Sequence, residues 1–459
     1  MSNKLFYRLG LEDLVEDTSA DEPETLEEMA GEATPESDIL AADQQGEELE
    51  GDQADVDGIA SDTETMEEVS KGLEAALKSG KPSADAIVFS NMAINAVNKK
   101  WFGGNNLTVS AESISSPEEA IVASMEGAVD KIKELGRALV EKLKKMWNTF
   151  SGWVKSLLDG SGKLKARAEA LAKKAGELKG KPPALGELSV KEHSFVKELA
   201  VDNKIDPASL IKGVAALNEL TQGIGSSAAI SVALGEMGKR VIEGGENADQ
   251  NGWSKFTEAF NNLLKPLGGG ELVKDAKWAP EGAKVARGKN DLPGNKALFT
   301  VLPAAESAPT GIADSAKQYG KFKIVIKELA PIGDDLKGGL TAPGAIADMA
   351  KTLGEICGRV GEYKKAYGSR EQLRGLVIKG LEDSAKAASG EDGDKAKAAN
   401  DRAVYARAFA TAWSSLVSAD YAVMSYILKT VKGFLAYGDL CVKQASEAKP
   451  AQSEPPKAE

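Results

Sequence analysis

The sequence predicts a mainly α-helical protein, a helical bundle of long amphipathic helices with a small inserted β-hairpin or sheet, preceded by a largely disordered acidic head. Apolar residues recur at helical spacing through most of residues 113–459. Two short segments within residues 268–332 are instead rich in β-branched and aromatic residues. Residues 1–112 carry 26 Asp+Glu against 7 Lys+Arg, a net charge of −19, and residues 113–459 carry 44 against 50, a net of +6.

This charge boundary, near residues 110–112, separates two electrostatically opposite parts of one chain. The intact protein, at −13, is weakly repelled by a polyanion such as DNA, whereas the part after the boundary tolerates or attracts one. A cut at the boundary would therefore change what the protein binds. The pattern suggests a protein that is matured by proteolysis.

Within the acidic head, residues 1–70 hold 23 acidic residues and two basic ones, so burial of apolar surface cannot offset the entropy of ordering them. We expect disorder there, with short helices at residues 4–15 and 84–102. In the second, Ile94, Val97 and Trp101 recur at helical spacing. It is expected to be a docking helix on a flexible tether; the alternative, that 84–102 belongs to the folded body, stays open.

The first helical region, residues 113–267, opens with a long amphipathic helix from Pro117 to about residue 157. Ser116 is suited to the N-cap and Pro117 to the first helical position. Its apolar stripe includes Trp147, Phe150 and Trp153 beside lysines, which would suit a membrane surface. Such stripes more often face a protein core or a partner protein.

A second helix is expected at about residues 162–179, with a high density of basic side chains. Lys163, Lys165, Arg167, Lys173 and Lys174 are the candidate phosphate contacts. The segment has no interleaved aromatic residues and no recognised nucleic-acid motif, so contact with DNA would be independent of base sequence. A solvated helix face is the commoner explanation of such a pattern.

Short helices should follow. Asp206 and Pro207 mark the start of one helix, and another is expected to begin near Trp253 and to end before Gly268. The small α+β insertion, residues 268–332, should contain strands at 297–303 and 321–329, joined by an exposed connection.

The second helical region, residues 333–447, closes the bundle. Helices are expected at 343–365 and 370–388, followed by a last long helix within 395–445 whose apolar face packs against the helix that begins after Ser116. The Pro-rich tail, residues 448–459, should be disordered.

Catalytic and cofactor signatures are absent from the sequence. His193 is the single histidine, and Cys357 and Cys441 have no metal-ligand spacing. Dinucleotide, P-loop and zinc-protease motifs are also absent. We therefore expect no enzyme, no catalytic residue, no cofactor and no metal. Neither a signal peptide nor an apolar run of 18 residues occurs, which favours a chain made in the cytoplasm without a transmembrane segment.

The run VSAESISSPEEAIVASMEG at 109–127, after an acidic segment that opens MSNKLFYRLGLEDLVE, resembles the internal virion proteins of giant tailed phages of the phiKZ kind. The resemblance extends weakly to NKALFTVLP and to the aromatic last helix. It implies a propeptide cut by the prohead protease after a small residue, any residue and glutamate. Ser110, Ala111 and Glu112 occupy these positions, and Ser113 would become the new N-terminus.

The same three-residue pattern recurs elsewhere, for example at 20–22, 175–177 and 445–447, and the charge boundary and the polar context select 110–112. Residues 20–22 could be an additional cut. The resemblance implies a structural protein of the prohead core, inside the capsid, that is matured by loss of its acidic propeptide and retained with the DNA. The expected partners are the prohead protease, other capsid or core proteins and non-specifically bound packaged DNA, with a homo-oligomer left open. The alternative is a membrane-active or host-directed effector ejected with the genome.

Overall fold

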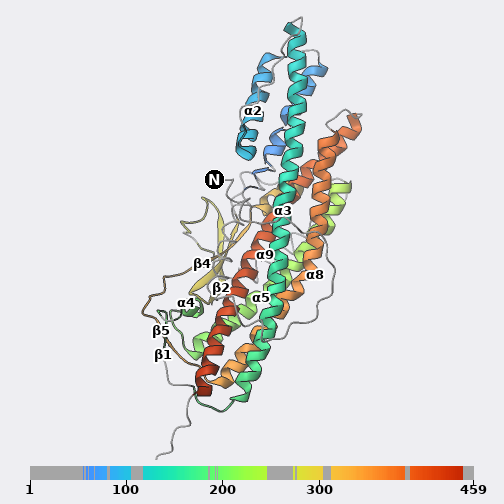
Figure 1. The fold of residues 1–459 in the computed structure, drawn as a ribbon. Coiled ribbons are helices and arrows are strands. Elements are labelled where there is room, and N and C mark those ends of the chain that lie inside the picture. The colour runs from blue at the N-terminus through green and yellow to red at the C-terminus, as the bar shows by residue number, and fades with distance from the viewer. Residues whose placement is uncertain are drawn as a thin grey trace, which may run out of the picture. The chain divides into compact units, whose positions relative to one another are not determined.

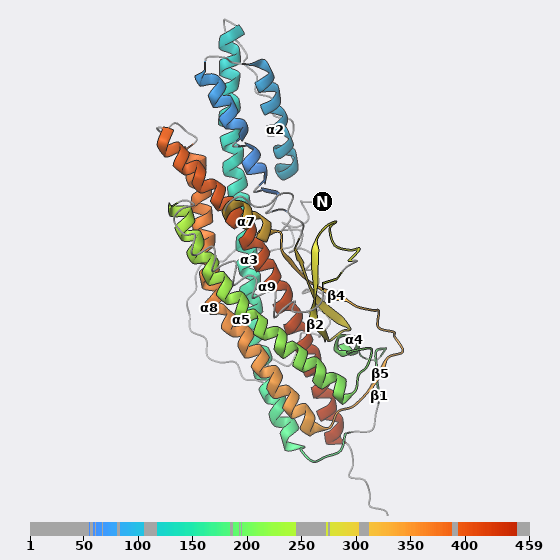
Figure 2. The ribbon, with the colours of Figure 1, turned by 180° about the vertical axis from the view of Figure 1, so that it is seen from behind.

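The computed structural model describes a helical bundle with a small sheet, as the sequence predicts (Figures 1 and 2). All described residues belong to one compact unit, residues 45–459. The described residues are 55, 58–59, 61–66, 68–79, 83–104, 117–183, 187–191, 193, 195–244, 272–273, 276–302, 312–387 and 393–447. The expected helix at 4–15, the helix expected from about Trp253 to before Gly268, and the expected disordered tail at 448–459 lie outside them.

Four long helices form the bundle: α3 (Pro117–Glu177), α5 (Pro207–Gly244), α8 (Pro343–Ala387) and α9 (Gly393–Glu447). The contacts fix their directions. Trp147 of α3 stacks on Trp413 of α9, with ring centroids 4.8 Å apart, and Arg167 pairs with Asp439 further along both helices, so α3 and α9 run parallel. The helices α5 and α8 run the opposite way (Figure 1), and α8 and α9 each contact both α3 and α5.

The helices are longer than expected. The helix α3 continues through residues 158–162, where the sequence indicated a break between two helices. Ser161 lies there between two glycines, yet its hydroxyl is buried and donates to the carbonyl of Leu158 at 2.6 Å. It also faces Gly361 of α8. Packing between helices thus overrides the low helix propensity of glycine and serine. In the same way, α8 is one helix where two were expected.

A polar cluster lies between α3 and α8. Ser151 accepts a hydrogen bond from Tyr367 at 2.8 Å and donates one to Glu371 at 2.9 Å. Arg374 pairs with Glu371 at 2.8 Å and also donates to Asn148. The hydrogen bonds of Ser151 and Asn148 cross from α3 to α8, so they favour one relative position of the two helices.

The last helix has the predicted apolar face. In α9, all ten residues of that face are buried or partly buried: Tyr405, Phe409, Trp413, Leu416, Val417, Met424, Ile427, Leu428, Val431 and Leu435. The predicted start of α5 is also present, since the carboxylate of Asp206 accepts from the backbone N–H of Ser209 at 2.7 Å. Both predictions, the apolar face of α9 and the N-terminal cap of α5, depend on residues that lie close together in the sequence.

Three antiparallel strands, β2 (Lys284–Leu292), β3 (Lys296–Leu302) and β4 (Lys323–Glu328), form the main sheet in the order β2-β3-β4. The pairing of β3 with β4 is the expected one, and β2 was not predicted. Its turn to β3 places Gly294 and Asn295 at positive φ, 76° and 52°, a conformation that these two residue types adopt readily. One face of the sheet joins the main core, and Trp278 covers Phe299 on the other.

The connection from β3 to β4 is not simply an exposed excursion. It contains helix α7 (Ile312–Gly320), which packs on α9 and buries Ile312 and Ala316. Two short strands, β1 (Glu187–Ser189) and β5 (Lys337–Gly339), pair beside the short helix α4 (Phe195–Leu199). The expectation of an exposed connection between β3 and β4 was wrong because the nine residues of α7 are only modestly hydrophobic. Their helical pattern is weak in the sequence, and the helix depends on packing against α9.

A helical pair packs on the N-terminal half of α3. Its second helix is α2 (Ala84–Phe102), which has the bounds expected from the sequence and contacts α3. Its first part is helical at the described residues within 58–78, where Ile59, Met66 and Leu73 are buried. The expectation of disorder over 1–70 is therefore wrong for the described residues after 58. We call residues 58–104 the cap.

Candidate functional site

The predicted cleavage residues Ser110, Ala111, Glu112 and Ser113 lie outside the described residues. The structure describes both flanks of the segment that contains them. Helix α2 ends at Phe102 and is followed by Gly103 in the left-handed conformation, with φ 62°. Helix α3 begins at Pro117. The predicted cut thus falls in the connection between two helices that contact one another.

Trp101 anchors the cap to α3. Its side chain is 9% exposed, and its indole N–H donates to the carboxylate of Asp62 at 2.5 Å, which joins the two helices of the cap. Across the interface, Lys142 of α3 donates to the backbone carbonyl of Trp101 at 3.1 Å and places its ammonium 5.0 Å from the ring centroid. Sequence periodicity identified Trp101 but could not identify these two partners, which are distant in the chain.

Two ion pairs connect the cap with the body. Glu74 lies 3.5 Å from Lys133 of α3, and Glu64 lies 3.1 Å from Lys317 of α7. The Glu64 pair is more than one-third exposed on both sides and contributes little in water. The buried apolar residues of the cap, Ile59, Met66 and Leu73, therefore contribute more to its attachment than the Glu64 pair does.

The five candidate phosphate contacts are all exposed on the C-terminal part of α3. They do not form one stripe. Lys163, Arg167 and Lys174 are separated by steps of four and seven residues and share one flank of the buried face, whereas Lys165 lies on the other flank. Arg167 is occupied by Asp439 at 2.7 Å. The structure therefore places Lys163 and Lys174 on the α9 side, about three helical turns apart, and Lys165 on the other flank.

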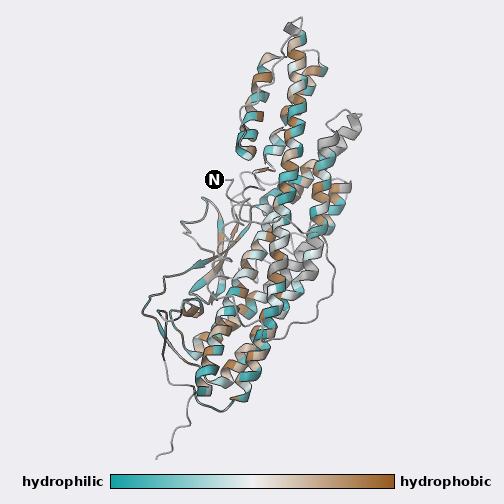
Figure 3. Ribbon diagram, viewed as in Figure 1, coloured by the Kyte–Doolittle hydropathy of each residue, from teal (hydrophilic) through white to brown (hydrophobic). Residues whose placement is uncertain are grey.

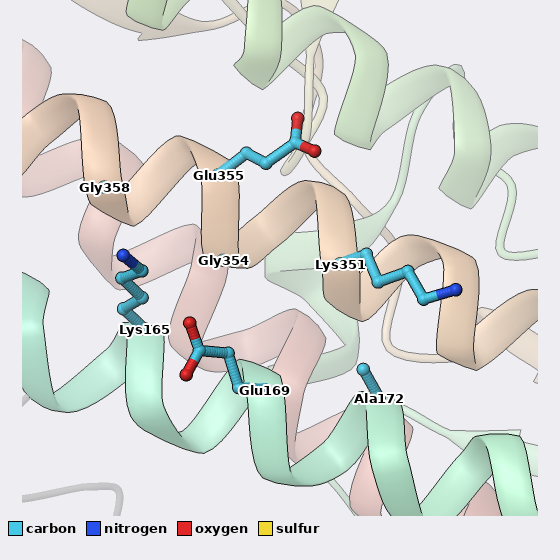
Figure 4. A pocket seen from close by; sticks show the side chains of 7 residues that line it. All are labelled: Lys165, Glu169, Ala172, Lys351, Gly354, Glu355 and Gly358. Atoms are coloured by element: carbon cyan, nitrogen blue, oxygen red, sulfur yellow. The ribbon is translucent and has the colours of Figure 1, made fainter.

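Lys165 instead borders a shallow hollow of about 440 Å³ between α3 and α8 (Figure 4). Its other charged lining residues are Glu169, Lys351 and Glu355, and Gly354 and Gly358 form the floor on α8. Two positive and two negative side chains give the hollow no net charge. It is not suited to a phosphate or to any strongly charged ligand.

The thiols and the aromatic stripe belong to the core. Cys357 and Cys441 are buried, and burial raises the pKa of the Cys357 thiol to about 12, against a smaller opposing effect of the Lys165 charge. Burial also raises the pKa of Cys441. Trp147 is fully buried against Trp413, so it is not available to a membrane surface. The side chains of Phe150 and Trp153 lie outside the described set.

His193 precedes α4 and is partly exposed, with its ring 5.3 Å from Phe195. Among the residues that the structure describes, no group of three or more His, Cys, Asp or Glu side chains is arranged to hold a metal ion. The described helices include none that is both long and apolar enough to cross a membrane. Figure 3 shows the reason, since hydrophilic and hydrophobic residues alternate along them.

Comparison with known proteins gives one family. The family of phiKZ-like phage internal head proteins matches residues 17–440, which include the cap, the sheet and all of the bundle except the last seven residues of α9. No curated protein and no solved structure matches. The match covers well over half of the chain, and it places the protein inside the phage capsid. The chain belongs to the phiKZ-like phage internal head proteins.

Proposed function

We propose that this chain is a non-enzymatic structural protein of the prohead core that is made with an acidic propeptide. The propeptide is cut off after Glu112, and the remaining body is retained in the capsid with the DNA. The observation that carries the proposal is the change in net charge from −19 to +6 across one connection between two helices. The family supports the location and the structural role. It is also the ground for expecting the prohead protease and other capsid or core proteins as partners.

Electrostatics explains why such a cut would matter. A chain at −13 is repelled by DNA, and separating the acidic residues leaves a body with six more basic than acidic residues, 50 against 44. Lys163 and Lys174 are exposed and available for phosphate contact. Hydrolysis is irreversible, so the change in charge would persist in the finished particle.

The rival function, a membrane-active or host-directed effector ejected with the genome, rests on the aromatic stripe of α3. Trp147, the first residue of that stripe, is buried in the bundle against Trp413. A membrane role would require α3 to leave the bundle. We therefore favour the role inside the head.

N-terminal sequencing of the protein from purified virions tests the proposal. A start at Ser113 is the expected result. Glu112→Gln should abolish this cut, whereas Glu177→Gln should have no effect, because residues 175–177 form the C-terminal end of helix α3, which would have to unfold before cleavage. Full-length protein in mature virions would refute the proposal.

A further inference from the structure

The cap and the N-terminal half of α3 form a three-helix module with a continuous apolar interior. The first cap helix contributes a stripe at alternating steps of four and three residues, all of it buried: Ile59, Thr63, Met66, Ser70 and Leu73. The second contributes Ile94, Val97 and Trp101. Spacing of this kind is the signature of helices that pack side by side along their length.

The N-terminal half of α3, which α2 contacts, has a row of buried apolar residues: Met125, Ala128, Val129, Ile132, Leu135 and Leu139. Figures 1 and 2 show α2 and the helix before it alongside this end of α3. If the cap left, the apolar face of α3 from Met125 to Leu139 would lose this cover and become accessible to water. Contact with the cap therefore contributes to the burial of that face.

The negative charge of the acidic head is not in the cap. Residues 1–54 hold 17 acidic and two basic residues, a net of −15, whereas residues 58–104 hold six acidic and five basic residues, a net of −1. The cap thus has the composition of a folded helical pair, and the residues before it have the composition of an acidic tail. Most of the negative charge that repels DNA therefore lies in the tail.

We propose that the cap stays bound to α3 as a separate chain after the connection at 105–116 is cut, and that the acidic residues before it are removed by a further cut on the N-terminal side of the cap. This inference rests on the proposed cut after Glu112 and deepens it. The binding partner of the α3 face is the protein's own severed cap. The mature protein is then a complex of two chains, with the tail lost and the apolar face of α3 still covered.

An engineered cut tests retention without the phage protease. Residues 105–109 of the full-length protein are replaced by the recognition sequence of a sequence-specific protease, and the protein is cleaved and passed over a size-exclusion column at micromolar concentration. We expect both fragments to elute together. Elution of the larger fragment alone would overturn the proposal.

Variants test the contact that holds the cap. Trp101→Ala should raise the dissociation constant of the cut cap by at least about 30-fold, the size expected when a buried tryptophan anchor is truncated. Lys142→Met keeps the aliphatic stem but removes the hydrogen bond to the Trp101 carbonyl. It should raise the dissociation constant of the cut cap by about 10-fold. Phe89→Ala on the same helix is the control, because Phe89 is 70% exposed and should change it by less than about 2-fold. Equal effects of all three would refute the assignment.

Mass spectrometry of purified virions separates this inference from the proposed function. We expect peptides from 58–104 in equal amount with peptides from the body, and none from 1–54. If the body starts at Ser113 and cap peptides are missing, the cap has left and the inference fails while the proposed function stands. If an uncut chain is found, the proposed function itself fails.

Discussion

Replacing Trp147 by alanine tests whether the aromatic stripe of α3 belongs to the bundle core. The side chain is 0% exposed and its ring centroid lies 4.8 Å from that of Trp413. Truncating a buried tryptophan to alanine removes its apolar burial and leaves a cavity, which together reduce the free energy of unfolding by about 3–5 kcal/mol. Loss of the ring pair adds about 0.5–1.5 kcal/mol.

Trp147→Phe is the matched control. The indole N–H of Trp147 is buried and has no hydrogen-bond partner within the described part of the chain. Phenylalanine keeps an aromatic ring against Trp413 and removes this unpaired donor, whose burial costs about 1–3 kcal/mol. The gain offsets much of the lost burial, so Trp147→Phe should lie within about 1 kcal/mol of the parent protein.

Urea unfolding followed by circular dichroism at the helical band measures both variants. The midpoint for Trp147→Ala should fall well below that of the parent, and the midpoint for Trp147→Phe should stay close to it. Equal midpoints for the parent and the alanine variant would show that Trp147 is not a core residue. In that case the membrane interpretation of the stripe would regain its basis.

Three further predictions follow from other parts of the structure. Gly320→Ala should destabilise the protein by about 1–3 kcal/mol in the same unfolding assay, because the added Cβ would lie 2.9 Å from the backbone of α9. Gly152→Ala is the control: its Cβ would point into open space, and the substitution should stabilise the protein by up to about 1 kcal/mol. The free energy of unfolding should fall as the pH rises from about 9 towards 12, since the Cys357 thiol ionises in the unfolded chain at a lower pH than in the folded one. In a series of unfolding midpoints measured against pH, Cys357→Ala should make this fall smaller. For the fragment 113–459, replacing Lys163 and Lys174 by glutamine should reduce the salt dependence of DNA binding by about one unit of slope per lysine, measured by fluorescence anisotropy; an unchanged slope would exclude these residues as phosphate contacts.

The sequence predicted those elements whose local signals agree with their packing. The apolar face of α9 is broad enough to be read without a partner, and the carboxylate of Asp206 caps α5 from within its own turn. The strands β3 and β4 carry β-branched residues that helices disfavour. In each case a short window of sequence contains the whole physical cause.

Elements that depend on distant partners were missed. Helix α7 is held by α9, and the continuity of α3 through Ser161 depends on α8. The first cap helix was hidden by its composition, because acidic residues dominate the average while Ile59, Met66 and Leu73 recur every seven residues. A search of the acidic region for that spacing would have found it.

The candidate site was only partly predictable for a related reason. The sequence offered five basic residues as candidate phosphate contacts beside the commoner explanation of a solvated helix face. A helix distributes such neighbours around its axis, and Arg167 is paired with Asp439. Helical geometry alone predicts which lysines lie on the same side of α3. Which of them form ion pairs with other helices depends on the positions of α8 and α9. The hollow beside Lys165 could not have been predicted from α3 alone.

The division of the acidic head into a tail and a cap changes how a charge switch would operate. The contacts between the cap and α3, including the hydrogen bond from Lys142 to Trp101, do not involve the peptide bond after Glu112, so a cut there does not by itself remove them. The acidic residues 1–54 are joined to the cap, so they remain on the body as long as the cap does. A change in net charge therefore requires one of two events. Either the cap dissociates, which uncovers the apolar face of α3, or the chain is cut between tail and cap, which leaves that face covered. Because exposing that face is unfavourable in water, the second route is the one that the packing supports.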